Sequence, residues 1–423
     1  MVALGALVPL RSMARDRPMV ADVEQLPAPT GSFAVGRTVF HWIDSSRTEP
    51  FATALSSRRE VMVYVWYPAE RPAAAGEGPY FPHLDAIARA LGDSGLRDEF
   101  GAALAGIASG AVRSFVVDGA KLARTDRPLP VLLFSHGFGE SSLTYSAQLA
   151  DLASHGYVVF GIEHPHDAFA VWFPDGRVVS FANAQWDSAR ARPNGAVAYQ
   201  LAQVPIRAGD IRFVLDRVTR LGHEGPGRTP FSGRLDLSRL SAFGHSLGGV
   251  AAASACRVDA RIRSCLNEDA DDDGRPFDGG TAAPLIKQPF LFFATGHSIY
   301  VSARTPQPTE AALARMKLTR VQYDSIVTLY QGNQDRSLAS MPGSATRVMA
   351  EAPDFTHRTF IDLKLLAASG DTATQQRRYM QLIRRYVLAF FDETLLGETN
   401  TPLDQSTPLD SIMTVNRYGR AKH

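Results

Sequence analysis

The chain has 423 residues, of which 45% are hydrophobic, and its 44 Lys and Arg residues balance 43 Asp and Glu residues. Such a chain can bury a large core, and its near-zero net charge gives no reason to expect nucleic acid as a partner. No stretch approaches the roughly 18 apolar residues that a membrane span requires, so no transmembrane segment is expected.

Residues 1–35 are interpreted as an N-terminal extension and linker. Residues 1–10 are apolar, but they lack preceding basic residues and are short for a signal-peptide core, while residues 11–30 are rich in Pro and charge. A disordered start of a soluble protein and a clipped export signal both stay open. Cys256 and Cys265 flank a helix-to-strand connection and are predicted to be two buried free thiols.

The first half of the chain alternates between strand and helix patterns. Residues 39–43 and 59–67 carry β-branched and aromatic side chains, which predicts the antiparallel opening strands of a mixed sheet. The apolar run 129–135 predicts a strand buried on both faces. The further elements expected here are a helix at 84–108, a short strand at 114–117, a helix at 145–154, a buried strand at 156–162 and a helix at 205–221. The β-α-β order implies a parallel pair with a right-handed crossover.

Two polar turns follow the buried strands. His136-Gly-Phe-Gly139 is the H-G-x-G turn in which ester hydrolases of the α/β type place part of the oxyanion hole, although an ordinary glycine turn would look the same. The donors would be the backbone N–H groups of Phe138 and Leu247. His164-Pro-His166-Asp167 could bind a metal, but no clear third ligand lies at metal-site spacing. Hydrogen bonding within the loop is therefore the interpretation we adopt, with no metal.

Residues 240–249, Leu-Ser-Ala-Phe-Gly-His-Ser-Leu-Gly-Gly, contain the G-x-S-x-G pattern of a nucleophile elbow. An apolar strand leads into Ser246 and a run of small helix-forming residues follows it. Bulk at Gly244 or Gly248 would clash with the neighbouring strand and helix, because the serine must sit on a tight, strained turn. Ser246 is therefore the candidate nucleophile.

Several motifs together resemble the platelet-activating factor acetylhydrolase family and its bacterial relatives. They are Val-Met-Val-Tyr-Val-Trp-Tyr-Pro at 61–68, residues 135–139, Leu-Ala-Ser-His-Gly-Tyr-Val-Val at 152–159, residues 164–167 and the G-H-S-L-G-G elbow. The resemblance runs from about Gly36 to Asp392. It implies an α/β-hydrolase fold over residues 36–396, with a mostly parallel central sheet and helices on both faces. It also implies cofactor-free hydrolysis of short or oxidised acyl esters.

The resemblance also implies where the acid of a triad lies. The family places an aspartate at the end of the strand after the elbow helix, expected at 261–266, and matching Asn-x-Asp assigns it to Asp269. The next residues depart from the family, because the acidic run Asp269–Asp273 resembles the start of a calcium loop. That loop needs Glu at its twelfth position, where this chain has Gly280. An acidic, solvated loop at the rim of the pocket is the interpretation we adopt.

The C-terminal third supplies the candidate base. A buried strand at 288–296 precedes a predicted insertion of two short helices at about 300–341, including a Thr319–Gln322 capping box, which we expect to cap the site. His357 follows the last strand, 347–352, and matches the family's H-x-x-F-x-D, while His297 is its competitor. An amphipathic closing helix at 376–396 and a loosely held tail at 397–423 complete the chain.

The sequence thus predicts a serine carboxylic-ester hydrolase in which Ser246, Asp269 and His357 form a triad. Its partner would be a small-molecule ester or lipid, and no cofactor is expected. The same machinery could cleave a polyester, thioester or amide. From another class of protein, the chain could be an inactive hydrolase-fold binding protein, although such proteins usually lose a triad residue. Acyl and alcohol specificity and oligomeric state are not predicted.

Overall fold

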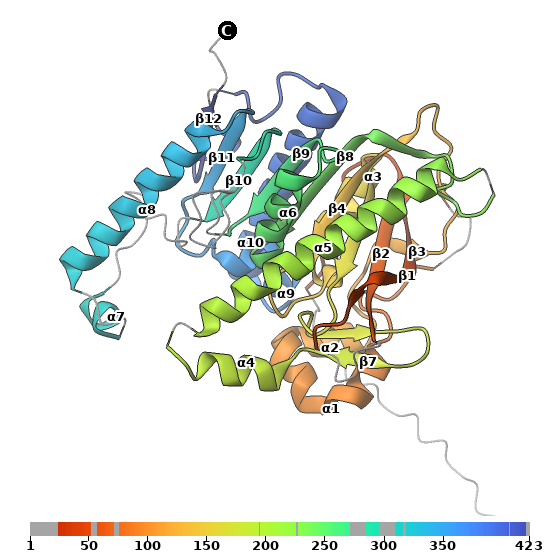
Figure 1. Ribbon diagram of the computed structural model, residues 1–423, viewed down its shortest axis with the longest axis horizontal. Coiled ribbons are helices and arrows are strands. Elements are labelled where there is room, and N and C mark those ends of the chain that lie inside the picture. The colour runs from red at the N-terminus through yellow and green to blue at the C-terminus, as the bar shows by residue number, and fades with distance from the viewer. Residues whose placement is uncertain are drawn as a thin grey trace, which may run out of the picture.

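The computed structural model describes residues 24–51, 57–71, 76–193, 195–225, 227–270, 285–295, 309–315, 319–405 and 407–419. A twisted ten-stranded sheet with helices on both faces dominates it (Figure 1). Along the sheet the strands are β12 (Met413–Tyr418), β11 (Ala345–Ala350), β10 (Phe290–Thr295), β9 (Ser264–Glu268), β8 (Leu235–His245), β4 (Leu129–Ser135), β5 (Val158–Glu163), β2 (Arg58–Ala69), β1 (Ala34–Thr48) and β3 (Val116–Asp118). The run from β11 to β5 is parallel, and β12, β2 and β1 are added antiparallel. A separate hairpin pairs β6 (Ala170–Trp172) with β7 (Val178–Ser180).

The register of the central strands brings three turns to one edge of the sheet. Ser135 at the end of β4 pairs with Gly244 of β8, and His245 of β8 pairs with Glu268 at the end of β9. Because parallel strands that end in register share one edge, the residues that follow β4, β8 and β9 emerge together. This edge carries the candidate site.

Helices cover the two faces of the sheet. One face carries α3 (Ser146–Ser154), α9 (Asp362–Leu366) and α10 (Gly370–Phe391), and the other carries α5 (Gly195–His223), α6 (Leu247–Val258) and α8 (Arg320–Ser340) (Figure 1). The remaining helices are α1 (Leu84–Phe100), α2 (Leu104–Ala108), α4 (Asn183–Arg190) and α7 (Glu310–Arg315), with short turns at Gly101–Ala103, Ser142–Tyr145, His357–Phe360 and Asp392–Leu396. Within the described ranges, no helix combines the length and apolarity that crossing a bilayer would take.

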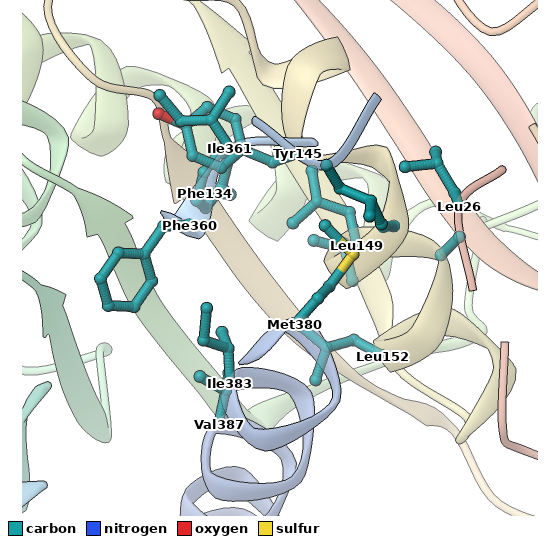
Figure 2. Packing of buried hydrophobic residues seen from close by; sticks show 14 of the residues in the cluster. Leu26, Phe134, Tyr145, Leu149, Leu152, Phe360, Ile361, Met380, Ile383 and Val387 are labelled. Atoms are coloured by element: carbon teal, nitrogen blue, oxygen red, sulfur yellow. The ribbon is translucent and has the colours of Figure 1, made fainter. Parts of the chain in front are cut away.

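The larger core cluster forms where α3 and α10 pack on the sheet. Figure 2 shows Leu149 and Leu152 of α3 facing Met380, Ile383 and Val387 of α10. These five side chains are at most 4% exposed. The apolar face of the predicted amphipathic closing helix is buried: Leu382, Ile383, Tyr386, Val387 and Phe390. Burying such side chains stabilises a fold by roughly 1.5–3 kcal/mol each.

The segment before β1 packs on this layer, which differs from the linker predicted to residue 35. Leu26 is 2% exposed and belongs to the larger core cluster. Thr30 donates from its N–H and its hydroxyl to Asp151 of α3, at 2.7 and 2.9 Å. Composition indicates a linker because Pro and charge are frequent there, but the fold engages the segment through backbone groups, polar side chains such as Thr30, and the buried Leu26.

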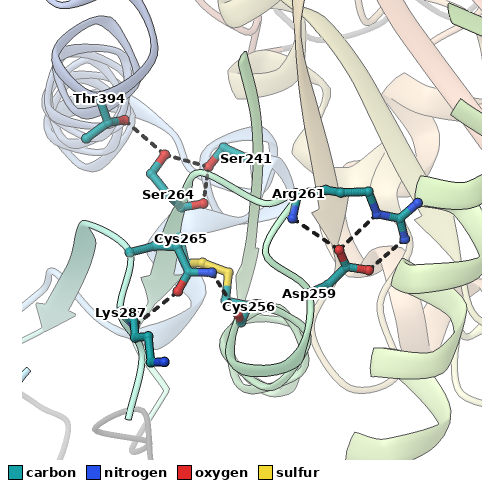
Figure 3. The surroundings of a disulfide bond; sticks show 9 residues. Ser241, Cys256, Asp259, Arg261, Ser264, Cys265, Lys287 and Thr394 are labelled. Carbon is teal, nitrogen blue, oxygen red and sulfur yellow. Dashed lines mark hydrogen bonds and ion pairs between the residues drawn. A yellow bond between two sulfur atoms is a disulfide. The ribbon is translucent and has the colours of Figure 1, made fainter. Parts of the chain in front are cut away.

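Cys256 and Cys265 form a disulfide, so the prediction of two free thiols is wrong (Figure 3). Cys256 lies in the last turn of α6 and Cys265 in β9, and their Cα atoms are 6.6 Å apart, within the range that a disulfide spans. The chain reverses between the helix and the strand, which brings the two residues together. Local sequence pattern does not predict such a reversal at side-chain resolution.

The predicted insertion is in part a crossover helix. α8 is 21 residues long and leads into β11, beside which it lies (Figure 1). Leu338 and Met341 join the core cluster on the α5–α6 face. Thr319 and Gln322 form the predicted capping box. Residues 300–308 and 316–318 lie outside the described ranges, so the cap over the site stays a prediction.

Residues 413–418 belong to the sheet and are not part of a loosely held tail. β12 pairs antiparallel with β11 from Ala345 opposite Tyr418 to Ala350 opposite Met413. Arg417 holds this strand in place by ion-pairing with Glu393 and Asp404. The strand is six residues long, and Arg417 interrupts the apolar–polar alternation that Met413 to Asn416 begin, so the pattern is too short to predict it.

Candidate active site

The turn between β8 and α6 presents Ser246 as the elbow pattern predicts. Its backbone has φ 54° and ψ −129°, in a region that residues with a side chain rarely adopt. A Cβ on Gly244 or Gly248 would collide with the carbonyl oxygen of Ser135, so the flanking glycines are sterically required. The Ser246 N–H donates to the carbonyl of Glu268 at 2.8 Å, which ties the elbow to the end of β9.

Asp269 and His357 contact each other across the same edge. Oδ2 of Asp269 lies 2.7 Å from Nδ1 of His357. Oδ1 of Asp269 accepts from the N–H of Thr295 at 2.7 Å and from its hydroxyl at 2.9 Å. The Asp269 side chain is 1% exposed, whereas that of His357 is 47% exposed. A buried, fully hydrogen-bonded carboxylate therefore orients an imidazole that is open to a ligand.

The residue before the serine links the elbow to His357. Nε2 of His245 lies 2.9 Å from the carbonyl oxygen of His357, and the two rings are 4.4 Å apart. Nδ1 of His245 lies 2.8 Å from the hydroxyl of Tyr145, which also accepts from the N–H of Gly137 at 3.1 Å. Burial holds the pKa of His245 well below its usual value, so this ring is neutral. These contacts place His357, the elbow and the H-G-x-G turn together.

Arg207 of α5 supports the H-G-x-G turn. Its side chain is 1% exposed and donates to the carbonyl oxygens of His136 and Gly137. It also forms an ion pair with Asp167, whose carbonyl accepts from the N–H of Gly139 at 3.0 Å. Rotating the peptide groups of the turn would break the hydrogen bonds that Arg207 donates to their carbonyl oxygens, so Arg207 holds the turn in one conformation.

Two backbone donors are available at the elbow and the turn. Among the described residues, the N–H groups of Phe138 and Leu247 donate to no hydrogen-bond acceptor. Leu247 is the first residue of α6, where the helix dipole favours negative charge. These are the two donors that the sequence predicts for an oxyanion hole.

The His164–Asp167 turn is engaged in hydrogen bonds. His164 bonds to Ser135 Oγ at 2.8 Å and to Asp210 at 2.9 Å. Burial lowers the pKa of His164 to about 4. Burial alone would raise the pKa of Asp210, but the Arg59 guanidinium holds it below its usual value. Over the described residues, no group of three His, Cys, Asp or Glu side chains could hold a metal, and the calcium-like positions 271–280 lie outside those residues.

Glu268 is a second buried acid beside Asp269. Its side chain is fully buried and receives a hydrogen bond from Gln148. Burial raises the pKa of Glu268 to about 8, so this carboxyl is largely neutral at pH 7. Two adjacent carboxyl groups thus differ in environment, and Asp269 is the one hydrogen-bonded to the imidazole.

The sequence profile described as platelet-activating factor acetylhydrolase, isoform II, matches residues 19–407. The chain belongs to this family. A probable 1-alkyl-2-acetylglycerophosphocholine esterase from Arthroderma benhamiae is 26% identical over 276 residues, which cover 63% of this chain. The platelet-activating factor acetylhydrolase of Bos taurus is 26% identical over 253 residues, which cover 56% of this chain. The matched regions span 64% and 50% of those relatives' own lengths.

A solved ferulic acid esterase from Streptomyces cinnamoneus has a similar structure, with a TM-score of 0.66 and 26% sequence identity over 93% of this chain and 99% of that chain. The sheet order and this similarity show the predicted α/β-hydrolase fold. The relatives and the solved neighbour carry the names acetylhydrolase and esterase.

Sequence reasoning missed the residues that support the site in this family member. Arg207, Tyr145 and Thr295 were not singled out, although each hydrogen-bonds to the turn or to Asp269. Arg207 lies on an otherwise apolar face of its helix. That position could have predicted a buried arginine, which needs hydrogen-bond partners inside the protein. His245 lies inside the elbow motif, yet the pattern does not assign it a role.

Proposed function

We propose that this chain hydrolyses carboxylic esters through an acyl-enzyme formed on Ser246. His357 takes the proton from Ser246, which attacks the acyl carbonyl, and Asp269 orients and stabilises the charged imidazole. Water then releases the acyl group by the same route. The 2.7 Å contact between Asp269 and His357, beside the strained elbow, is the observation that carries the proposal.

The Phe138 and Leu247 amides would stabilise the tetrahedral oxyanion. Removing one such donor typically costs about 3–4 kcal/mol of transition-state stabilisation. Support comes from the two unengaged N–H groups and from Arg207, which holds the carbonyls of the turn. A fixed donor pair needs no reorganisation when charge develops, which is why a rigid turn favours catalysis.

The substrate would be a small ester or lipid with a short or oxidised acyl group. The names of the relatives range from esterases of acetylated glycerophosphocholines to an esterase for ferulic acid. A polyester, thioester or amide substrate would use the same residues. An inactive binding protein is disfavoured because candidates for all three triad positions and both oxyanion donors are retained.

The test is labelling by a fluorophosphonate probe together with ester hydrolysis. We expect wild-type protein to be labelled and Ser246→Ala to stay folded, escape labelling and lose about 10⁴- to 10⁶-fold in kcat. Ser238→Ala is the matched control, because Ser238 is an exposed serine on the same strand. Hydrolysis by Ser246→Ala within tenfold of wild type would refute the mechanism.

We also propose an oxidising compartment for the folded protein. The Cys256–Cys265 disulfide supports this, because disulfides persist in secreted and periplasmic proteins and are rare in a reducing cytosol. Alkylation of thiols in protein isolated from its native cells tests the idea. Protein recovered mainly with two free thiols would contradict it.

A further inference from the structure

Four aromatic rings gather beside the H-G-x-G turn, and we call them the aromatic wall: Phe138, Phe181, Trp186 and Tyr199. The Phe138 ring centroid lies 5.1 Å from that of Phe181, 5.0 Å from that of Trp186 and 6.1 Å from that of Tyr199. Phe138 meets its three neighbours edge to face. Trp186 belongs to α4 and Tyr199 to α5. All four side chains are partly exposed, so ring surface is left for another group.

The wall lies on the opposite side of the proposed reaction centre from His357. In the sheet, β4 and β5 are on one side of β8, and β9 and β11 are on the other. Phe138 follows β4, whereas Asp269 and His357 follow β9 and β11. The leaving alcohol must lie at His357, which returns the proton to it. The oxyanion would point to the N–H groups of Phe138 and Leu247, which leaves the acyl substituent the side of Ser246 away from His357, where β4 and the Phe138 turn lie.

Two buried oxygen atoms near the wall lack partners. The Tyr199 hydroxyl and Oδ1 of Asp167 are buried and make no hydrogen bond among the described residues. Asp167 is otherwise fixed, since Oδ2 pairs with Arg207 and its carbonyl accepts from Gly139. A buried tyrosine hydroxyl usually finds a partner, so a polar ligand group that reached Tyr199 would satisfy a hydroxyl that the described residues leave unpaired.

We propose that the aromatic wall binds an aryl ring in the acyl part of the ester, so that the preferred substrates are esters of phenyl-substituted short-chain acids, with a ring hydroxyl favoured. The proposal rests on the hydrolase function proposed above. An added ring would pack edge to face against the wall, as Phe138 already does with its neighbours. A ring hydroxyl would hydrogen-bond to the unpaired hydroxyl of Tyr199.

The first experiment compares esters that differ only in where the ring lies. Methyl 3-phenylpropanoate and 2-phenylethyl acetate are isomers, with the ring in the acyl part and in the alcohol part, and methyl butanoate lacks the ring. We expect kcat/KM for methyl 3-phenylpropanoate to exceed both others by about tenfold or more, the scale set by one well-packed group. Methyl 3-(4-hydroxyphenyl)propanoate should be better again.

Variants then assign the preference to the wall. Trp186→Ala should reduce kcat/KM for the aryl ester about tenfold more than for methyl butanoate, and Trp186→Phe should retain much of the preference. Tyr199→Phe should erase only the advantage of the ring hydroxyl. Trp172→Ala is the matched control, because Trp172 stacks on His83 at 3.6 Å, outside the wall, and should leave the ratio between esters unchanged.

The outcomes separate the two proposals. Equal kcat/KM for the phenyl and butanoate esters, a faster 2-phenylethyl acetate, or a ratio that Trp186→Ala does not change would each overturn aryl binding at the aromatic wall while leaving the hydrolase proposal standing. Failure of wild-type protein to hydrolyse any of the esters or to react with fluorophosphonate would overturn both.

Discussion

The hydroxyl of Tyr145 lies 2.8 Å from Nδ1 of His245 and fixes which nitrogen of that ring carries the proton. The hydroxyl accepts from the Gly137 N–H, so it donates its own proton to Nδ1. Nε2–H of the neutral ring then donates to the carbonyl of His357. A chain of three hydrogen bonds thus runs from the H-G-x-G turn to the backbone of the candidate base.

Replacing Tyr145 should therefore disturb activity as well as stability. Tyr145→Phe leaves the Gly137 N–H and His245 Nδ1 unpaired and buried, which should cost about 1–3 kcal/mol of unfolding free energy. Because the turn and His357 lose their common support, we expect kcat to fall roughly ten- to hundredfold with a smaller change in KM. Steady-state kinetics and thermal melts measure both effects.

Tyr157→Phe is the control for this prediction. The Tyr157 ring is also fully buried, and its hydroxyl donates to Asp392 at 2.7 Å, remote from the site. It should lose stability while keeping kcat within about threefold of wild type. Equal kcat losses in the two variants would mean that Tyr145 acts only through general stability.

Asp269→Asn should lower kcat about 10³- to 10⁴-fold, because an amide cannot hold His357 in the tautomer that accepts a proton from serine. Thr295→Val should be milder, since it removes one of the donors to Asp269 and keeps the N–H donor. Kinetics on an acetyl ester give the ranking. A Thr295→Val variant more impaired than Asp269→Asn would contradict the role assigned to the carboxylate.

Glu268 should make the protein less stable at alkaline pH. Burial raises the pKa of Glu268 to about 8, whereas its value in an unfolded chain is near 4.5. The folded state therefore holds this proton longer, so stability is greatest below the unfolded pKa and is lost as pH rises through the folded pKa. Between pH 6.5 and 8 the loss is on the order of 2 kcal/mol.

Thermal melts at pH 6.5 and pH 9 test this. The melting temperature of wild type should fall by roughly 3 °C more than that of Glu268→Gln, which stays neutral and nearly isosteric. Other buried acids such as Asp362, whose pKa burial raises to about 7, are present in both proteins and cancel in the comparison. Identical declines would show that Glu268 is ionised in the folded state throughout.

Reducing the Cys256–Cys265 disulfide should lower the melting temperature. The bridge closes a nine-residue separation, for which loop entropy predicts about 2–3 kcal/mol of stabilisation. Cys265→Ser should melt like reduced wild type, and dithiothreitol should shift the variant no further. A melting temperature of wild type that dithiothreitol does not change would contradict the prediction.

Local patterns predicted the elements that position the candidate site, and long-range contacts account for what they missed. Ser246 and Asp269 directly follow β8 and β9, and His357 follows β11. The sequence could predict these positions because the apolar pattern of each strand identifies it. Arg207 and Tyr145 were not predicted, because their roles depend on carbonyls and rings more than 60 residues away in the chain. The disulfide and β12 were missed for the same reason.

The segment before β1 bears on how the protein withstands proteolytic trimming. Arg384 of α10 donates to the carbonyls of Pro27 and Ala28, and Thr30 holds α3. The first described contact of the segment is the ion pair of Glu24 with Arg377. A protease that cuts ahead of Glu24 would leave these bonds intact. A protease that cuts at Ser32 would release Leu26 from the core and remove two of the carbonyl acceptors of the buried Arg384. We therefore expect cleavage within the segment before β1 to destabilise the whole fold, unlike cleavage ahead of Glu24.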